Sequence, residues 1–367
     1  MSELSPGLVS AAASSAPCYI YDARAFASRA TEVLALVDEY FYPIKANPDP
    51  AIVRAAIGAG AGLDVCSSGD LVIALASGVK PAACSFTSAH LHEALARDLL
   101  ATSVSVDLDS LGQVALWVAV GGRKAGLRVC TANAQSAYGS KFGLTPAGLA
   151  EAARVLEAAG GRVSTLHLHD AHADATPEQM ADSLAAVLET VPEGLLASCE
   201  RVNIGGGWPM RDGMPVPASG LASTFGRLRA RLSDLGFRGR LAAEPGEWTV
   251  GPSGWLAARV SAVKSHPVLA DRLIVVLDTA TPVPCRPSRA PFALLRDGAA
   301  VSERAQDVVA CDVYGSANTG LDTIGVGVSM PPPRVGDTVV SAGQGAYARQ
   351  LTGSFNERTV PEGVVLR

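Results

Sequence analysis

The stretch Tyr42-Pro43-Ile44-Lys45-Ala46-Asn47 closes the first of several short apolar segments from which the fold can be inferred. Aromatic and apolar residues precede Lys45, and a proline-rich turn follows it, so we predict a strand over Phe41–Lys45 that ends at the lysine. A charged side chain at the end of a buried strand points out of the core. Lys45 is therefore the first candidate for a functional residue.

Seven similar segments follow Lys45, and helix-like stretches rich in Ala, Leu and Arg separate them. The predicted strands are Gly62–Val65, Cys84–Thr87, Ser103–Val106, Gly126–Cys130, Thr165–His169, Arg201–Ile204 and Arg240–Ala243. The predicted helices include Asp49–Ala59, Ser68–Ala76, Leu91–Leu99, Pro146–Ala159, Pro177–Thr190 and Gly220–Leu235. This alternation predicts an α/β protein with a parallel sheet, and eight units favour a (β/α)8 TIM-like barrel. A doubly wound sheet is the alternative.

The composition of the sequence changes after about Gly251. Pro, Gly and β-branched residues become frequent there, and the helical periodicity of apolar residues is largely lost. The predicted strands of this part are Ala257–Lys264, Leu273–Asp278, Asp307–Val313 and Thr338–Ser341. We therefore expect a barrel domain over residues 22–250 and a C-terminal β domain, a sandwich or barrel, over residues 251–367. Residues 1–21 are expected to join the β domain, with a flexible Ser/Ala-rich lead-in before Pro17.

Composition narrows the class of protein. The net charge of −5 argues against nucleic acid as a partner, because phosphate binding needs a basic face. The longest clean apolar run, Leu273-Ile274-Val275-Val276-Leu277, is too short to span a membrane. No basic residue precedes Arg24, unlike in a secretory signal. The 7 cysteines form no CxxC pair, which favours a reducing cytoplasm.

The distinctive polar residues and glycines follow or end predicted strands. They are Lys45, Asp64, His169, Gly205-Gly206-Gly207 and Glu244. In a barrel the carboxyl ends of the strands form one face, and chemistry takes place there. A triple glycine lets backbone N–H groups approach an anion such as a phosphate, although a tight turn is the alternative explanation.

Together these motifs resemble the fold type III pyridoxal phosphate (PLP)-dependent decarboxylases, which include the ornithine, diaminopimelate and arginine decarboxylases and share the alanine racemase fold. The motifs are Tyr42-Pro43-Ile44-Lys45-Ala46-Asn47, Ser140-Lys141-Phe142-Gly143, Leu166-His167-Leu168-His169, Ile204-Gly205-Gly206-Gly207, Glu244-Pro245-Gly246 and Gly345-Ala346-Tyr347. The resemblance runs from about Pro17 to Asn356. It implies a barrel plus a β domain, PLP as cofactor, and a homodimer with shared active sites.

The resemblance also implies roles for the site residues. Lys45 would form the Schiff base with PLP, Glu244 would face the pyridine nitrogen, and His169 would stack on the ring. The alternatives are a surface charge for Lys45, a salt bridge at the barrel rim for Glu244 and a buried structural histidine for His169. Asp64 would lie beside the lysine, and Asp70 would cap or orient. The phosphate would be held by Gly205, Gly206, Gly207, Gly246 and Tyr347.

Two departures from the family pattern fall in the cofactor motifs. Glu247 stands where the family has an arginine that helps to hold the phosphate, so we expect its carboxylate to point elsewhere. His172 stands in place of a phosphate-binding serine and could donate to the phosphate instead. A zinc site at His167, His169 and His172 is disfavoured, because no ligand set with metal spacing surrounds them. We expect no metal.

A further departure concerns the loop that the family supplies from the second subunit. Asn318 stands where the family has a cysteine that returns the proton after carbon dioxide leaves, and Thr319 replaces an acidic residue that contacts substrate; Asp322 is kept. An amide is a poor proton donor. Either another group (His90, Tyr138 or a water) supplies the proton, or the reaction differs from simple decarboxylation.

Arg286-Pro287 resembles the motif with which diaminopimelate decarboxylases grip a distal carboxylate, and a guanidinium suits a carboxylate. A surface charge is the alternative for Arg286. The tyrosine that usually follows is absent, since Arg289 and Ala290 stand there. The substrate is thus expected to carry a distal carboxylate or other anionic group without being diaminopimelate itself.

We therefore predict a cytoplasmic amino-acid decarboxylase that works through an external aldimine and a quinonoid, with Lys45, Glu244, His169 and Asn318 as catalytic positions. Arg286, Thr319 and Asp322 would contact a small-molecule amino acid, either free or tethered to a carrier protein. Racemisation, epimerisation or other carbanion chemistry is the second hypothesis, because Asn318 replaces the thiol. An antizyme-like regulator without activity is the third.

Overall fold

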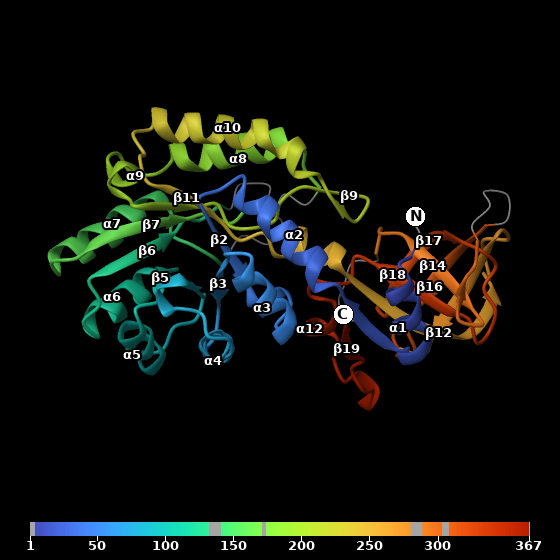
Figure 1. The fold of residues 1–367 in the computed structure, drawn as a ribbon. Coiled ribbons are helices and arrows are strands. Elements are labelled where there is room, and N and C mark those ends of the chain that lie inside the picture. The colour runs from blue at the N-terminus through green and yellow to red at the C-terminus, as the bar shows by residue number, and fades with distance from the viewer. Residues whose placement is uncertain (1–3, 132–140, 171–173, 280–287, 303–307, 367) are drawn as a thin grey trace. The chain divides into compact units, whose positions relative to one another are not determined.

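The computed structural model of the protein describes residues 4–131, 141–170, 174–279, 288–302 and 308–366 (Figure 1). The chain divides into two compact units. One unit, which contains the barrel, comprises Ala27–Met210 and Val216–Trp248; the other comprises Met1–Phe26, Arg211–Pro215 and Thr249–Arg367. No helix among the described residues is long and apolar enough to cross a membrane. The predicted boundaries at residues 22 and 250 stay a prediction.

The barrel unit is a closed ring of parallel strands in the order β11-β2-β3-β4-β5-β6-β7-β8. Their bounds are β2 Glu39–Pro43, β3 Gly62–Val65, β4 Cys84–Thr87, β5 Ser105–Leu108, β6 Lys124–Arg128, β7 Arg162–His167, β8 Arg201–Asn203 and β11 Arg240–Ala243. Because β11 pairs with β2, with Ala242 opposite Glu39, the sheet closes on itself. This confirms the predicted (β/α)8 barrel and excludes the doubly wound sheet.

Helices connect the strands of the barrel and surround it (Figure 1). They are α2 Ala23–Leu34, α3 Pro50–Gly58, α4 Ser68–Ala76, α5 Glu93–Thr102, α6 Leu111–Ala119, α7 Pro146–Ala158, α8 Pro177–Glu189, α9 Leu195–Ser198, α10 Ala218–Asp234 and α11 Gly246–Val250. Several of these helices begin after a residue whose side chain caps the first turn, such as Ser67 for α4 and Thr176 for α8. These polar caps lie in the loops that precede the helices. Shorter elements are η1 Ile44–Ala46, η2 Pro81–Ala83, η3 Gly251–Ser253, β9 Met210–Arg211 and β10 Met214–Pro215.

The prediction that Lys45 ends a strand is wrong. Strand β2 ends at Pro43, and Lys45 lies in the 3-10 turn η1. The Tyr42 hydroxyl donates a hydrogen bond to the Asn47 carbonyl at 2.9 Å, which closes the turn in the buried interior. His169 likewise lies two residues beyond the end of β7 at His167. Strand ends depend on pairing with neighbouring strands, which local sequence does not specify.

The second unit contains a sheet whose main path runs β15-β14-β18-β12-β13-β16-β17, with β1 pairing β12 and β19. The bounds are β1 Cys18–Tyr21, β12 Gly254–Ser265, β13 Arg272–Leu277, β14 Phe292–Arg296, β15 Ala299–Ala300, β16 Val309–Tyr314, β17 Thr323–Met330, β18 Thr338–Ala342 and β19 Glu362–Val365. Short helices are α12 Ala348–Leu351 and η4 Phe355–Glu357. The sequence predicted β12, β13, β16 and β18 but not β1, β14, β15, β17 and β19; β1, β15 and β19 are shorter than those predicted, and glycines interrupt β17.

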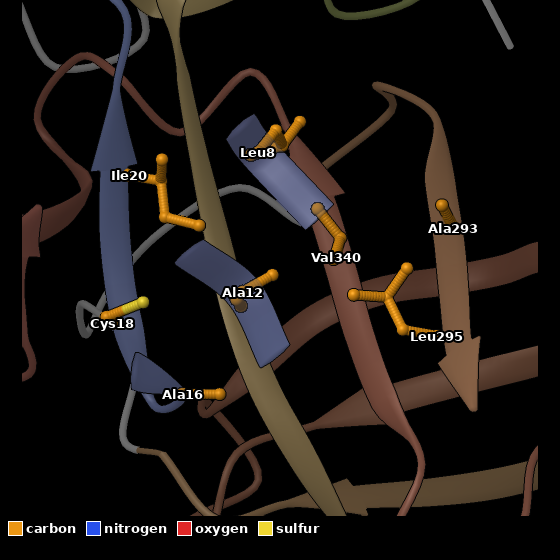
Figure 2. Packing of buried hydrophobic residues seen from close by; sticks show 9 residues of the cluster. Leu8, Ala12, Ala16, Cys18, Ile20, Ala293, Leu295 and Val340 are labelled. Atoms are coloured by element: carbon orange, nitrogen blue, oxygen red, sulfur yellow. The ribbon is translucent and has the colours of Figure 1, made fainter. Parts of the chain in front are cut away.

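The prediction of a flexible lead-in is also wrong, because residues Pro6–Ser15 form helix α1. Ser5 caps this helix by accepting a hydrogen bond from the Leu8 N–H group. Leu8 and Ala12 pack against Ile20 of β1 and Val340 of β18 (Figure 2). Alanine has the highest helix propensity and lets a helix approach a sheet closely, so a Ser/Ala-rich segment is ordered here by packing.

Candidate active site

Lys45 forms the centre of a polar cluster at the carboxyl ends of β2 and β3. Its Nζ donates to Asp64 Oδ2 at 2.8 Å and to Cys66 Sγ at 3.1 Å. The Asp64 side chain is 1% exposed and that of Lys45 is 45% exposed. Burial opposes the charge on Lys45, but Asp64, Cys66 and Glu244 outweigh burial and raise the pKa of the ammonium well above its usual value.

The turn from β3 into α4 fixes the position of Cys66. Asp70 Oδ2 accepts a hydrogen bond from the Cys66 backbone N–H at 2.9 Å, while Ser67 Oγ accepts one from the Asp70 N–H at 3.1 Å. This reciprocal pair resembles a capping box and holds the first turn of α4. Asp70 thus has the capping position expected for it. Cys66 itself was not among the predicted site residues.

Glu244 follows β11 and is buried in the barrel. Its Oε1 accepts a hydrogen bond from Asn203 Nδ2 at 2.6 Å, and its Oε2 lies 3.4 Å from His167 Nε2. Burial and the nearby carboxylate of Asp64 raise the pKa of Glu244 to about 7, although His167, Lys45 and Asn203 act in the opposite direction. The carboxyl group can therefore gain or lose a proton close to neutral pH.

A second buried carboxylate extends this chain of contacts across the barrel. His167 Nδ1 lies 3.1 Å from Asp107 Oδ2 and 3.1 Å from Thr87 Oγ1. Burial lowers the pKa of His167, but Glu244 and Asp107 outweigh this effect and raise it. Sequence analysis considered His167 only as a metal ligand and missed Asp107, Thr87 and Asn203. In the sequence they are recognisable only as polar residues in or next to predicted strands. Burying a polar group there costs free energy unless it is hydrogen-bonded.

His169 lies beside the glycine turn and is half-buried. Its Nδ1 accepts a hydrogen bond from the Gly206 N–H at 3.2 Å. Burial, together with the positive charge of His167, Arg128 and Lys45, lowers the pKa of His169 to about 3. The ring is therefore a neutral imidazole at physiological pH, consistent with a nitrogen that accepts a hydrogen bond.

The triple glycine is required by space and by backbone conformation. Gly205 and Gly207 have φ values of +68° and +72°. A Cβ on Gly205 would lie 2.5 Å from the Leu168 carbonyl oxygen, and one on Gly206 would lie 2.6 Å from the Glu244 carbonyl oxygen. The Gly205 N–H donates to Asn203 Oδ1 at 2.9 Å, so the glycine turn and Glu244 share one amide side chain.

The predicted substrate loop lies in the second unit and is described there by itself. Asp322 is 1% exposed, and its Oδ2 accepts a hydrogen bond from the Ala317 N–H at 2.6 Å. Asn318 is exposed, and its N–H donates to Asn356 Oδ1 at 2.9 Å. The Thr319 hydroxyl accepts the Leu321 N–H at 3.2 Å. The buried carboxylate of Asp322 thus holds the turn that presents Asn318.

The remaining predicted site residues divide into three groups. Tyr347 lies in the second unit with φ +60°. Gly246 is buried at the start of α11, and the neighbouring Glu247 is exposed, as expected for a carboxylate that points elsewhere. The predicted residues His172, Tyr138 and Arg286 lie outside the described residues. Across the ranges that the structure describes, no group of three or more His, Cys, Asp or Glu side chains could hold a metal ion.

The fold and the cluster define a barrel enzyme with a lysine paired to a buried carboxylate, and comparison with known proteins gives its family. A model of the pyridoxal binding domain of pyridoxal-dependent decarboxylases matches residues 23–251. Diaminopimelate decarboxylase of Deinococcus radiodurans is 26% identical over 366 residues, which cover 95% of this chain and 89% of that protein.

Solved structures are similar in fold. A crystal structure of a diaminopimelate decarboxylase gives a TM-score of 0.80 at 21% identity and covers 95% of this chain and 88% of its own. The lysine/ornithine decarboxylase of Vibrio vulnificus, complexed with putrescine, gives 0.79 at 18% identity and covers 100% and 99%.

The chain belongs to the pyridoxal-dependent decarboxylase family. It is a PLP-dependent carboxy-lyase, and the predicted family, enzyme class and cofactor are confirmed. The residues present fit PLP. A lysine amine is available for an aldehyde, Gly205 and Gly206 keep a narrow turn clear of side chains, and Asp64 Oδ1 is buried with no hydrogen-bond partner among the described residues.

Proposed function

We propose that the protein decarboxylates an amino acid whose distal end carries a carboxylate or another anionic group. The observation that carries the proposal is the pairing of Lys45 with Asp64 in a barrel mouth where Glu244 is buried. Lys45 is the one lysine in this cluster, and its amine is the group that an aldehyde cofactor needs. Homologues that are named as decarboxylases support the reaction class.

In this proposal PLP supplies the electron sink that accepts the electron pair left when the carboxylate departs. Lys45 would bind the aldehyde, and Asp64, whose Oδ2 lies 2.8 Å from Lys45 Nζ, would stabilise its positive charge. Glu244 would hold a proton for the ring nitrogen, because burial and the charge of Asp64 raise its pKa to about 7. Asn203 and His167 orient the Glu244 carboxyl group from two sides. The neutral ring of His169 offers a flat surface for stacking.

The phosphate contacts and the substrate contacts are part of the same proposal. Residues 205–207, with Gly246, Tyr347 and His172, would hold the phosphate. Arg286 would bind the distal anionic group, and Thr319 and Asp322 would act from the loop of a second copy of the chain in a homodimer. The diaminopimelate decarboxylases among the homologues are consistent with a substrate that has a charged distal end.

The test combines a spectrum and a product. The holoenzyme should show the absorbance band of an imine-bound PLP, and Lys45→Ala should lack it while keeping the folded circular dichroism spectrum. A panel of acidic and basic amino acids of both configurations should then give carbon dioxide from at least one acidic member. An imine band that survives in Lys45→Ala, or a panel without any gas release, refutes the proposal.

Racemisation or epimerisation is the second candidate, because the amide Asn318 stands where the family has a thiol. A racemase removes a proton from Cα and leaves the carboxylate in place. Chiral analysis of the same panel separates the two reactions, since inversion without gas would favour this candidate. A substrate tethered to a carrier protein would escape a panel of free amino acids, so aminoacyl thioesters of a phosphopantetheine analogue belong in it.

A further inference from the structure

We propose that Cys66 is the catalytic acid that returns a proton to the substrate Cα, in place of the thiol missing at position 318. This inference rests on the proposed decarboxylation. It assigns a catalytic residue from β3 and α4 of the same barrel that carries Lys45. Sequence analysis named only His90, Tyr138 or a water for this step, and His90 is exposed.

The position of the thiol carries the proposal. Cys66 Sγ lies 3.1 Å from Lys45 Nζ and 3.9 Å from Asp64 Oδ2. The substrate amine displaces Lys45 from the cofactor aldehyde, and Cα is bonded directly to that amine nitrogen. A group in contact with Lys45 Nζ is therefore beside the carbon that needs a proton. Asp70 fixes the backbone that carries this thiol through a 2.9 Å hydrogen bond to the Cys66 N–H.

The thiol also has a proton to give. Burial and the carboxylate of Asp64 raise the pKa of Cys66 to about 12, against the lowering effect of Lys45. The group is therefore protonated at neutral pH, unlike an activated nucleophilic cysteine, which needs a lowered pKa. A neutral thiol has the proton that a general acid gives up, and the adjacent Lys45 can stabilise the thiolate that the transfer leaves until the sulfur is protonated again.

The proton transfer balances without another reagent. When the carboxylate leaves as carbon dioxide, its bonding electron pair remains on Cα and the conjugated cofactor. The S–H bond of Cys66 breaks, a C–H bond forms at Cα, and the sulfur keeps an electron pair as a thiolate. The ammonium of the released Lys45, or a water, then protonates the sulfur.

The test compares holoenzymes of the wild type, Cys66→Ala and Cys66→Ser on the panel described above. Without the thiol, the electron pair is protonated on the cofactor carbon instead of on Cα. Carbon dioxide has then already left, and hydrolysis gives an aldehyde from the substrate and the amine form of the cofactor. We expect the ratio of aldehyde to amine product to rise at least ~10-fold in Cys66→Ala, given the ~10²–10⁴-fold contribution of general acids.

Cys199→Ser is the matched control. Burial raises the pKa of Cys199 to about 12 as well, but this thiol precedes β8, where its Sγ donates to the Leu195 carbonyl. Its product ratio should stay at the wild-type value. Retention of the imine-bound PLP band in every variant shows that each protein is folded and loaded.

A readout independent of turnover completes the test. In the apoprotein, iodoacetamide should alkylate Cys66 with a rate that rises only at strongly alkaline pH, as peptide mass spectrometry would record. Fixing PLP on the chain with borohydride should block that alkylation. An unchanged product ratio in Cys66→Ala, or equal alkylation with and without fixed PLP, overturns the role of Cys66 while the decarboxylase stands. Absence of gas from the wild-type enzyme overturns both.

Discussion

Replacing Asp64 by asparagine should make Lys45 a better amine for PLP at neutral pH. The two groups are 2.8 Å apart, and Asp64 is buried while Lys45 is half-exposed. The carboxylate of Asp64 favours the charged ammonium and so holds the pKa of Lys45 above its usual value, although exposure of the lysine to water weakens this effect. The fraction of neutral Lys45 amine at pH 7 should therefore rise at least several-fold in Asp64→Asn, because a close pair of opposite charges is worth on the order of 1 kcal/mol even in water.

The assay follows the capture of PLP by apoprotein. Apoprotein and PLP are mixed at a series of pH values, the imine is trapped with borohydride after fixed times, and peptide mass spectrometry counts Lys45 adducts. The midpoint of the rate against pH should move to lower pH in Asp64→Asn, because the lysine then loses its proton more easily. Glu200→Gln is the matched control, because Glu200 pairs with Lys124 at 2.7 Å on the surface. Its profile should overlay that of the wild type.

An unmoved midpoint in Asp64→Asn would refute the electrostatic account of Lys45. It would mean that water, and not the buried carboxylate, sets the pKa of the ammonium. A midpoint that moves upward would mean that Asp64 acts chiefly as a base during imine formation.

Three further predictions concern the buried carboxyl groups and the glycine turn. Glu244 binds its proton more tightly in the folded apoprotein, with a pKa of about 7 against its usual 4.5, so it contributes stability at low pH that is lost as pH rises toward 7. That loss is about 3 kcal/mol at 1.36 kcal/mol per unit. Between pH 5 and pH 8 the free energy of unfolding in urea should fall less in Glu244→Gln than in the wild type, by roughly this amount. An equal fall in both proteins would contradict the raised pKa of Glu244. Gly206→Ala should weaken PLP binding at least ~10-fold in a fluorescence titration, because its Cβ would lie 2.6 Å from the Glu244 carbonyl oxygen. Gly226→Ala is the control and should bind PLP normally, because a Cβ at this position of α10 meets no atom within 4 Å. Asp322→Ala should destabilise the turn that it holds by about 1–3 kcal/mol, seen as faster hydrogen exchange at Ala317, and unchanged exchange would show that the 2.6 Å contact is not needed.

Much of the barrel could be predicted from local sequence because each strand is short, apolar and buried. Helix α4 spans the predicted Ser68–Ala76, where a Ser67 cap and a run of aliphatic residues agree. The errors lie where tertiary pairing overrides local preference. Strand β5 begins at Ser105 and not Ser103, because Ser103 takes a left-handed conformation that ends α5. Helix α1 forms because its alanines pack on a sheet whose other strands come from distant parts of the chain.

The sequence by itself determined the alternation of strands and helices, the glycine turn and the presence of a lysine and a glutamate near strand ends, since each depends on a few neighbouring residues. Only the tertiary structure decided which side chains meet. Pairing of β2 with β3 places Cys66 against Lys45, and the ring of strands links Asp107, His167 and Glu244 from three different strands or strand ends. Such contacts depend on strand order and register around the ring, which no local pattern of residues specifies.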